Sequence, residues 1–279
     1  MILRLFCPKC AYFSLKEKRL TGSSKITIEV PMPVNRPSDD GRYEVHCAAG
    51  HVSIVTLDNV KFEILFEMGL NALIDGYPRE AVSSFASALE RFYEFYWNVV
   101  ANFNSIPQDQ IDAAWKTVGK QSERQLGMFV TASLMLTKKS PTLLNPNQEV
   151  AFRNRVIHGG YIPTTDEAII FGDAVMDLIN DSLTALRSLA FDALIGTYQN
   201  LSPAKTEATN GGVSKTGRDD AGDHTGVVNI VTCVDVRHPV TEVDDERRGG
   251  VAEQFERILR EREPHHLSFT DHIDSSRSN

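Results

Sequence analysis

The sequence contains no run of about 18 or more apolar residues, so it lacks a segment long enough to cross a bilayer. Residues 1–7 are too short an apolar stretch, and too soon interrupted by Arg4, to form a signal peptide. Only four cysteines are present, and two of them form a Cys-x-x-Cys pair. In a chain without an export signal, that pattern indicates metal binding rather than disulfide bonds. We therefore expect a cytoplasmic protein with no membrane segment.

The chain also has no excess of basic residues. The chain has 29 lysines and arginines against 37 aspartates and glutamates, which gives a net charge of −8. This balance argues against a protein that binds nucleic acid through a broadly basic surface, so any RNA-binding surface must be a local patch. The apolar fraction of 42% is nevertheless sufficient for a hydrophobic core.

Three common catalytic motifs are absent too. The sequence has no glycine-rich Walker loop, no Gly-x-Ser-x-Gly segment and no His-Glu-x-x-His segment. Nucleotide hydrolysis, serine hydrolysis and zinc proteolysis therefore have no motif support in this chain.

The cysteines that are present have the spacing of a metal site. Cys7 and Cys10 form the Cys-x-x-Cys pair, and Cys47 precedes His51 by four residues. Together these four residues would give a closed Cys₃His site of the kind that structural zinc prefers, which leaves no open position for a catalytic water. His46 is an alternative ligand, but it adjoins Cys47, and neighbours along a strand point to opposite faces. The remaining alternative is a Cys-x-x-Cys pair without a metal.

Short β-prone segments surround these ligands, at residues 25–30, 42–46 and 52–57, with a loop at 31–41 that is rich in proline and polar residues. Ligands and strands together resemble a zinc ribbon over about residues 1–57. Zinc ribbons bind nucleic acid, bind proteins or brace a neighbouring domain, so this resemblance implies a structural Zn²⁺ and leaves the function open.

From residue 59 the apolar period changes from two to about 3.6, which predicts helices. In the fourth predicted helix, the residues expected to face inward are Leu126, Phe129, Val130, Leu134 and Leu136. Asn147 is the expected cap of the fifth. The predicted helices cover residues 59–74, 78–100, 107–118, 121–137, 147–158 and 166–198.

Residues 152–160, with the sequence Phe-Arg-Asn-Arg-Val-Ile-His-Gly-Gly, combine polar chemistry with a helix end. On a helix, Asn154 and His158 are four residues apart and lie on one face. Arg153 and His158 are separated by about 140° around the axis, because each residue turns by about 100°. One helix therefore cannot easily close all three side chains on a small substrate, whereas two copies facing each other across a symmetry axis could.

The pattern Arg153-Asn154-x-x-x-His158 resembles the signature of HEPN domains, small all-helical domains of many toxins and antiviral ribonucleases. The resemblance extends over roughly residues 59–200. It implies a dimer with one composite site, in which Arg153 holds the scissile phosphate, Asn154 orients the helix or the RNA, and His158 is general base or acid. The alternative is an arginine and a histidine that merely cap a helix C-terminus, where cations are favoured.

Further residues are candidates for a supporting role. Lys138, Lys139 and Arg155 could contact an RNA backbone if they lie beside the motif, and Glu90 and Arg91 could support the site from the long second helix. The alternatives are a cation pair at a helix C-terminus and a solvated charge pair.

The chemistry favoured by these residues is RNA cleavage without a catalytic metal. Histidine can act as acid or base near neutral pH, and arginine can hold a phosphate through two parallel hydrogen bonds. The expected products are a 2′,3′-cyclic phosphate and a 5′-hydroxyl, and DNA, which lacks the 2′-hydroxyl, should not be cut. The main alternative is a non-catalytic dimeric module that binds RNA, a nucleotide or a protein. A transcription-associated zinc-ribbon protein is a further alternative, against which the acidic composition stands.

The C-terminal region is the least helical in pattern. Residues 201–226 are polar and predict a flexible linker, 227–236 are β-prone and could add a strand to another sheet, and 250–263 could form a short charged helix. His265, His266 and His272 lie in a polar tail that is expected to be unstructured, with a metal-binding cluster as the alternative.

The expected fold is therefore mainly α: an all-helical bundle at 59–200, a small N-terminal β zinc ribbon at 1–57, and a partly disordered region at 201–279 that could bind a protein partner.

Overall fold

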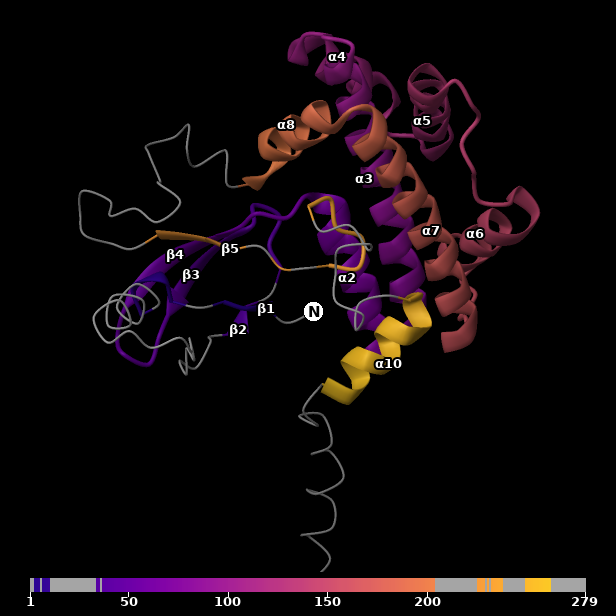
Figure 1. Ribbon diagram of the computed structural model, residues 1–279. Coiled ribbons are helices and arrows are strands. Elements are labelled where there is room, and N and C mark those ends of the chain that lie inside the picture. Colours follow the sequence, from indigo (N-terminus) through magenta and orange to yellow (C-terminus); the bar gives the residue numbers. More distant parts are fainter. Residues whose placement is uncertain are drawn as a thin grey trace, which may run out of the picture.

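A computed structural model describes residues 3–5, 7–10, 34–35, 37–203, 225–228, 230, 232–237 and 249–261. Figure 1 shows a helical bundle beside small β-sheets, so the prediction of a mainly α fold is confirmed. The predicted strand at 25–30, most of the predicted linker and the three C-terminal histidines lie outside the described residues. None of the helices in the described part of the chain is long and apolar enough to span a membrane.

Two of the predicted strands form a hairpin. Strand β3 (Arg42–His46) runs antiparallel to β4 (Val52–Leu57), with Arg42 opposite Thr56 and His46 opposite Val52. Tyr43 and Val45 are buried and alternate with exposed residues, as a strand with one covered face requires. A second antiparallel pair joins β1 (Leu3–Arg4) to β2 (Val34–Asn35).

The strand expected near the C-terminus is shorter and earlier than predicted. It is β5 (Thr225–Val228), which pairs in parallel with β4 and extends the hairpin to a three-stranded sheet in the order β3-β4-β5, called the small sheet below. The next described residue after β5, Ile230, has main-chain groups that bond to a side chain. Asn59 accepts a hydrogen bond from the Ile230 amide and donates one to its carbonyl, each at 2.9 Å.

The helices from α2 to α8 form a bundle around α3 (Pro78–Phe103), whose apolar stripe is buried as predicted. α3 contacts six other elements of the bundle: α2, α4, α5, α6, α7 and α8. The bounds of the remaining helices are α2 Lys61–Ile74, α4 Gln108–Val118, α5 Ser122–Thr137, the π-helical turn η1 Pro146–Val150, α6 Ala151–Ile157, α7 Thr165–Leu189, α8 Phe191–Leu201 and α10 Val251–Glu261.

The structure corrects three details of the helix predictions. Leu134 is 42% exposed instead of facing inward. The motif helix begins with η1, and the capping side chain is that of Asn145, which accepts a hydrogen bond from the Asn147 amide at 2.9 Å. The long helix predicted at 166–198 breaks at Ala190, whose φ of −144° lies outside the helical range. This break separates α8 from α7, and α8 packs on α3.

Two glycines make room for the ring of Phe85 in the core of the bundle. A Cβ atom at Gly69 of α2 would lie 2.5 Å from Phe85 Cε1, and one at Gly172 of α7 would lie 2.8 Å from Phe85 Cε2. Such distances are well below van der Waals contact, so α2 and α7 can approach Phe85 of α3 only because both positions lack a side chain.

We expect Gly69→Ala to destabilise the fold by about 1–3 kcal/mol, because the core around Phe85 has no space for a methyl group. Gly127→Ala is the matched control, since Gly127 lies inside α5 with nothing within 4 Å of the added atom. That change should stabilise by up to about 1 kcal/mol through helix propensity. Urea unfolding followed by far-UV circular dichroism measures both, and equal effects would contradict the packing argument.

Candidate functional site

The four predicted metal ligands come together between the N-terminal segment and the hairpin. Cys10 ends a short helical turn at residues 8–10, and Cys7 directly precedes this turn. Cys47 follows β3, and His51 precedes β4. All four ligand atoms lie within 4.8 Å of one another. The Cys10 Sγ atom is 3.7 Å from Cys47 Sγ and 3.3 Å from His51 Nδ1. This cysteine–histidine cluster could bind a metal ion.

A tight turn between β3 and β4 positions two of these ligands. Gly50 has a φ of +78°, which favours glycine, and its amide donates to the Cys47 carbonyl at 2.9 Å. The Cys47 amide in turn donates to the His51 carbonyl at 3.1 Å. His46, the alternative ligand, is exposed and lies 2.5 Å from Glu44. The turn therefore selects His51 for the cluster.

The electrostatics of the cluster favour a bound cation. Burial raises the pKa of the Cys10 thiol, and the neighbouring Cys47 and Cys7 thiols raise it further. Thiolates this close repel one another, and a divalent cation would reverse that repulsion and displace the protons. Cys7 is also fully buried, and its sulfur lies 3.5 Å from Ser53 Oγ.

The predicted catalytic arginine is held by other helices of the same subunit. Arg153 projects from α6 to Glu90 of α3, and its NH2 group lies 2.7 Å from Glu90 Oε1. The same nitrogen donates to Ser122 Oγ of α5 at 3.2 Å, and Ser122 donates to Glu90 at 2.6 Å. Only 19% of the Arg153 side chain is exposed. The guanidinium group is therefore fixed in place and its charge is balanced by Glu90.

The other two motif residues face solvent. Asn154 is exposed and accepts a hydrogen bond from Arg153 NH1 at 3.0 Å. His158 is exposed at the C-terminal cap of α6, and its side chain has no hydrogen-bond partner in the part of the chain that the structure describes. Gly160, with a φ of +70°, turns the chain away from the helix two residues later, so the predicted helix end is confirmed.

Of the two predicted supporting residues, only Glu90 reaches the motif. Arg91 pairs instead with Glu94 at 2.6 Å, and its guanidinium lies 5.8 Å from the centre of the Trp115 ring. Ser122 completes the arginine contacts and was not predicted from the sequence. It is 31 residues from Arg153 along the chain, and no local pattern indicates that the two meet.

The predicted RNA-contacting cations have local partners. Arg155 lies over the Tyr161 ring at 4.2 Å and is 3.7 Å from Glu167 Oε1, while remaining more than half exposed. Lys138 ends α5 in a left-handed conformation, and its Nζ donates to the Met135 carbonyl at 2.8 Å. Lys139 is exposed. Among the residues that the structure describes, no contact connects either lysine with Arg153 or His158.

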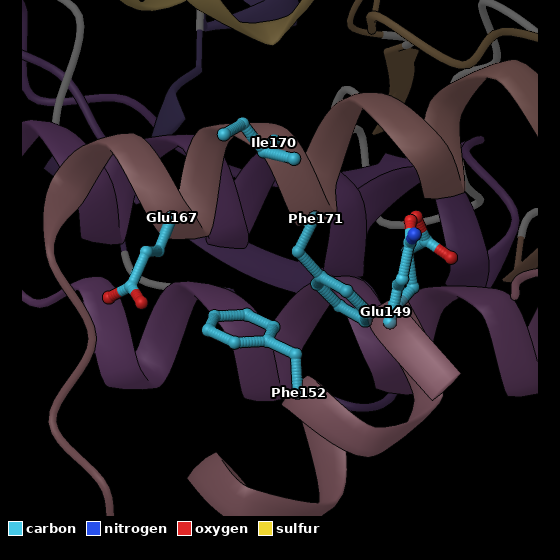
Figure 2. A pocket seen from close by; sticks show the side chains of 6 residues that line it. Glu149, Phe152, Glu167, Ile170 and Phe171 are labelled. Carbon is cyan, nitrogen blue, oxygen red and sulfur yellow. The ribbon is translucent and has the colours of Figure 1, made fainter. Parts of the chain in front are cut away.

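A shallow hollow lies beside the motif, between η1, α6 and α7. Figure 2 shows the rings of Phe152 and Phe171 side by side, with Glu149 toward one end and Glu167 toward the other. Both carboxylates already cap helices: Glu149 accepts from the Asn145 amide at 2.7 Å, and Glu167 from the Thr164 amide at 2.9 Å. The hollow is therefore better suited to an apolar side chain than to a polar ligand.

Comparison with protein-family models, with curated proteins and with solved structures finds no match for this chain.

Proposed function

We propose that the chain is an endoribonuclease of the HEPN type that cuts RNA in the cytoplasm without a catalytic metal. The observation that supports this most directly is the contrast between two residues of the motif. His158 is exposed and unpaired among the described residues, as a proton-transfer group must be, whereas Arg153 is fixed by Glu90 and Ser122. A preorganised cation beside an accessible imidazole suits phosphodiester cleavage.

Arg153 retains hydrogen-bonding capacity for a phosphate. A guanidinium has five N–H donors, and three are used here, one by Asn154, one by Glu90 and one by Ser122, so two remain. In the proposed reaction these hold a non-bridging oxygen of the scissile phosphate. His158 removes the proton of the 2′-hydroxyl, the 2′-oxygen attacks phosphorus, and the 5′-oxygen leaves with a proton from a second histidine.

The second histidine is proposed to come from a second copy of the chain. An apolar surface next to the motif supports this dimer, since Ile162 is 76% exposed and Ile170, at the edge of the Phe152 hollow, is 65% exposed. Exposed apolar residues grouped beside a hollow are typical of protein–protein contacts. Docking of two such surfaces would bring the two α6 helices together and complete a composite site.

The cysteine–histidine cluster is proposed to hold Zn²⁺. For tetrahedral zinc with bonds of about 2.3 Å to sulfur and about 2.0 Å to nitrogen, the expected separations are about 3.8 Å between sulfurs and about 3.5 Å from sulfur to nitrogen. The observed 3.7 Å from Cys10 to Cys47, and the 3.3 and 3.9 Å from Cys10 and Cys7 to His51, fit these values. Four protein ligands leave no position for water, so the metal would brace the hairpin and take no part in cleavage.

The test is RNA cleavage by the purified protein in the presence of EDTA, followed by analysis of the product ends. We expect 2′,3′-cyclic phosphate and 5′-hydroxyl ends, and no cleavage of a substrate with a 2′-deoxy nucleotide at the scissile position. Products with 5′-phosphate ends, or cleavage of the deoxy substrate, would contradict the mechanism.

The second candidate function is a non-catalytic dimeric module that binds RNA, a nucleotide or a protein. One observation favours it: Arg153 is mostly buried, with its charge balanced by Glu90 of the same subunit. A protein that binds a single-stranded RNA probe and leaves it intact under all the conditions above would support this alternative.

A further inference from the structure

The described residues of 225–261, called the strap below, cross from the small sheet to the helical bundle. Figure 1 shows β5 beside β4 at one end of this path, and α10 below α2 and α7 at the other. Between them, Val234 and Val236 are buried in the same core as the bundle helices. The strap therefore contacts both parts of the molecule and follows them in sequence.

The main chain of the strap is bound by polar side chains of α2 and by Asn59, which lies two residues before α2. Asn59 pairs with both main-chain groups of Ile230, as a neighbouring strand would. On α2, Glu67 Oε1 accepts from the Cys233 amide at 2.8 Å. These contacts are made to main-chain groups of the strap and need no particular side chain at Ile230 or Cys233.

The next residues of the strap are held in the same way. Glu63 Oε1 accepts from the Val236 amide at 2.8 Å, deep in the interior. From α7, Arg187 donates to the carbonyls of Asp235 and Val236 at 2.6 and 3.0 Å. Donors and acceptors of the body thus alternate along the strap, in the manner of a peptide-binding groove.

A final contact holds the start of α10. The Val251 amide donates to Asp173 Oδ1 of α7 at 2.5 Å, so a carboxylate occupies the N-terminus of the helix, where negative charge is favoured. Val251 itself is fully buried. Val251, Val234 and Val236 are buried apolar anchors of the strap, and Phe255 and Ile258 of α10 pack against the same core.

Docking of the strap also has identifiable costs. Asp235 is buried near Glu63, and burial together with this like charge raises the pKa of Glu63 to about 8. Arg237 pairs with Asp58 at 3.0 Å, yet its Nε and NH2 atoms are buried without a hydrogen-bond partner among the described residues. Crowded carboxylates and unpaired donors both lower the net stability of a contact. A segment held in this way is bound less tightly than its buried area suggests.

We propose that the surface formed by β4, α2 and α7 is a peptide-docking surface whose resident ligand is the chain's own strap, and that the strap can leave and be exchanged. Release uncovers the free edge of β4 and loosens the joint between the small sheet and the bundle. That joint is also held by residues 58–60, by Ile64 of α2, which packs against the core of the small sheet, and by the end of α8, where Tyr198 and Ser202 contact Asp58. This proposal does not depend on RNA cleavage.

The experiment uses the full chain with a specific protease site inserted within residues 204–224. After cleavage, the C-terminal fragment should stay bound and co-elute with residues 1–203 on size-exclusion chromatography. A fluorescent synthetic peptide of residues 225–261, added in large excess, should then replace it while the far-UV circular dichroism of the body stays constant. Binding of the peptide is measured by fluorescence anisotropy.

Two variant peptides make the test specific. A peptide with Val236→Asp should bind about 100-fold more weakly or worse, because it places a charge at a fully buried position. A peptide with Glu256→Ala is the matched control and should bind like the unaltered one, because Glu256 is exposed. The proposal is overturned if no exchange occurs, if exchange requires loss of the helical signal, or if the two variants bind equally.

Discussion

Replacing His158 with alanine should reduce RNA cleavage by about 100-fold to 10,000-fold, the range typical for loss of a general acid or base. The expectation follows from the position of this residue. Its side chain is exposed, makes no hydrogen bond within the described structure, and lies at the cap of α6, while Val156 buries the helix in the core. The substitution should therefore remove chemistry without removing stability, and thermal unfolding should be unchanged.

The matched control for this substitution is His46→Ala. His46 is also an exposed histidine, but it lies on β3 beside Glu44, in the small sheet rather than the bundle. The measurement is the initial rate at which wild type and both variants cleave one labelled RNA, and it tests the proposed catalytic role of His158. A His158→Ala protein that cuts at the wild-type rate would remove the basis for the proposed catalytic role, and an equal loss in both variants would point to an indirect effect.

Replacing Cys47 with serine should abolish stable metal binding and unfold the hairpin that carries it. Binding energies of structural zinc sites, about 10–16 kcal/mol in small zinc domains, are also folding energies, so loss of one ligand removes much of what holds such a domain together. Cys47 lies in the turn between β3 and β4, with its sulfur 3.7 Å from Cys10. The bundle has its own core and should keep its helical content.

Cys233→Ser is the matched control, because Cys233 is the one cysteine outside the cluster. This variant should retain one zinc per chain by mass spectrometry of metals. In the wild type, a thiol reagent should modify no more than one of the four cysteines until a chelator and denaturant are added. Full reactivity of all four in the native protein would contradict a metal site.

Much of the architecture follows from local patterns. A Cys-x-x-Cys pair and a Cys-x-x-x-His segment bring their own ligands together within a single turn each, so the cluster could be predicted from spacing. The apolar residues of α3 repeat with the helical period and are buried, namely Val82, Phe85, Ala86, Leu89, Phe92, Tyr93, Tyr96, Val99 and Val100. The glycines at positions 159 and 160 likewise indicate where α6 ends, because Gly160 has a positive φ.

Other features depend on contacts between segments far apart in the chain. Glu90 and Arg91 are adjacent and equally plausible in sequence, but they point about 100° apart around α3, and only packing decides which one faces α6. The break at Ala190 has no glycine or proline to announce it. Asn145 and Asn147 are both suitable capping residues, and the hydrogen bond from the Asn147 amide to Asn145 Oδ1 makes Asn145 the cap.

The sequence alone thus indicated the helical class, the two halves of the cysteine–histidine cluster and the end of α6, because each depends on residues within one or two turns of one another. The tertiary structure alone decided that Glu90 and Ser122 hold Arg153, that Phe85 lies between Gly69 and Gly172, and that residues 225–237 join the small sheet to α2. The contacts of Glu67 and Asn59 with the strap link residues that are 166 and 171 positions apart. No local periodicity or propensity encodes such pairs.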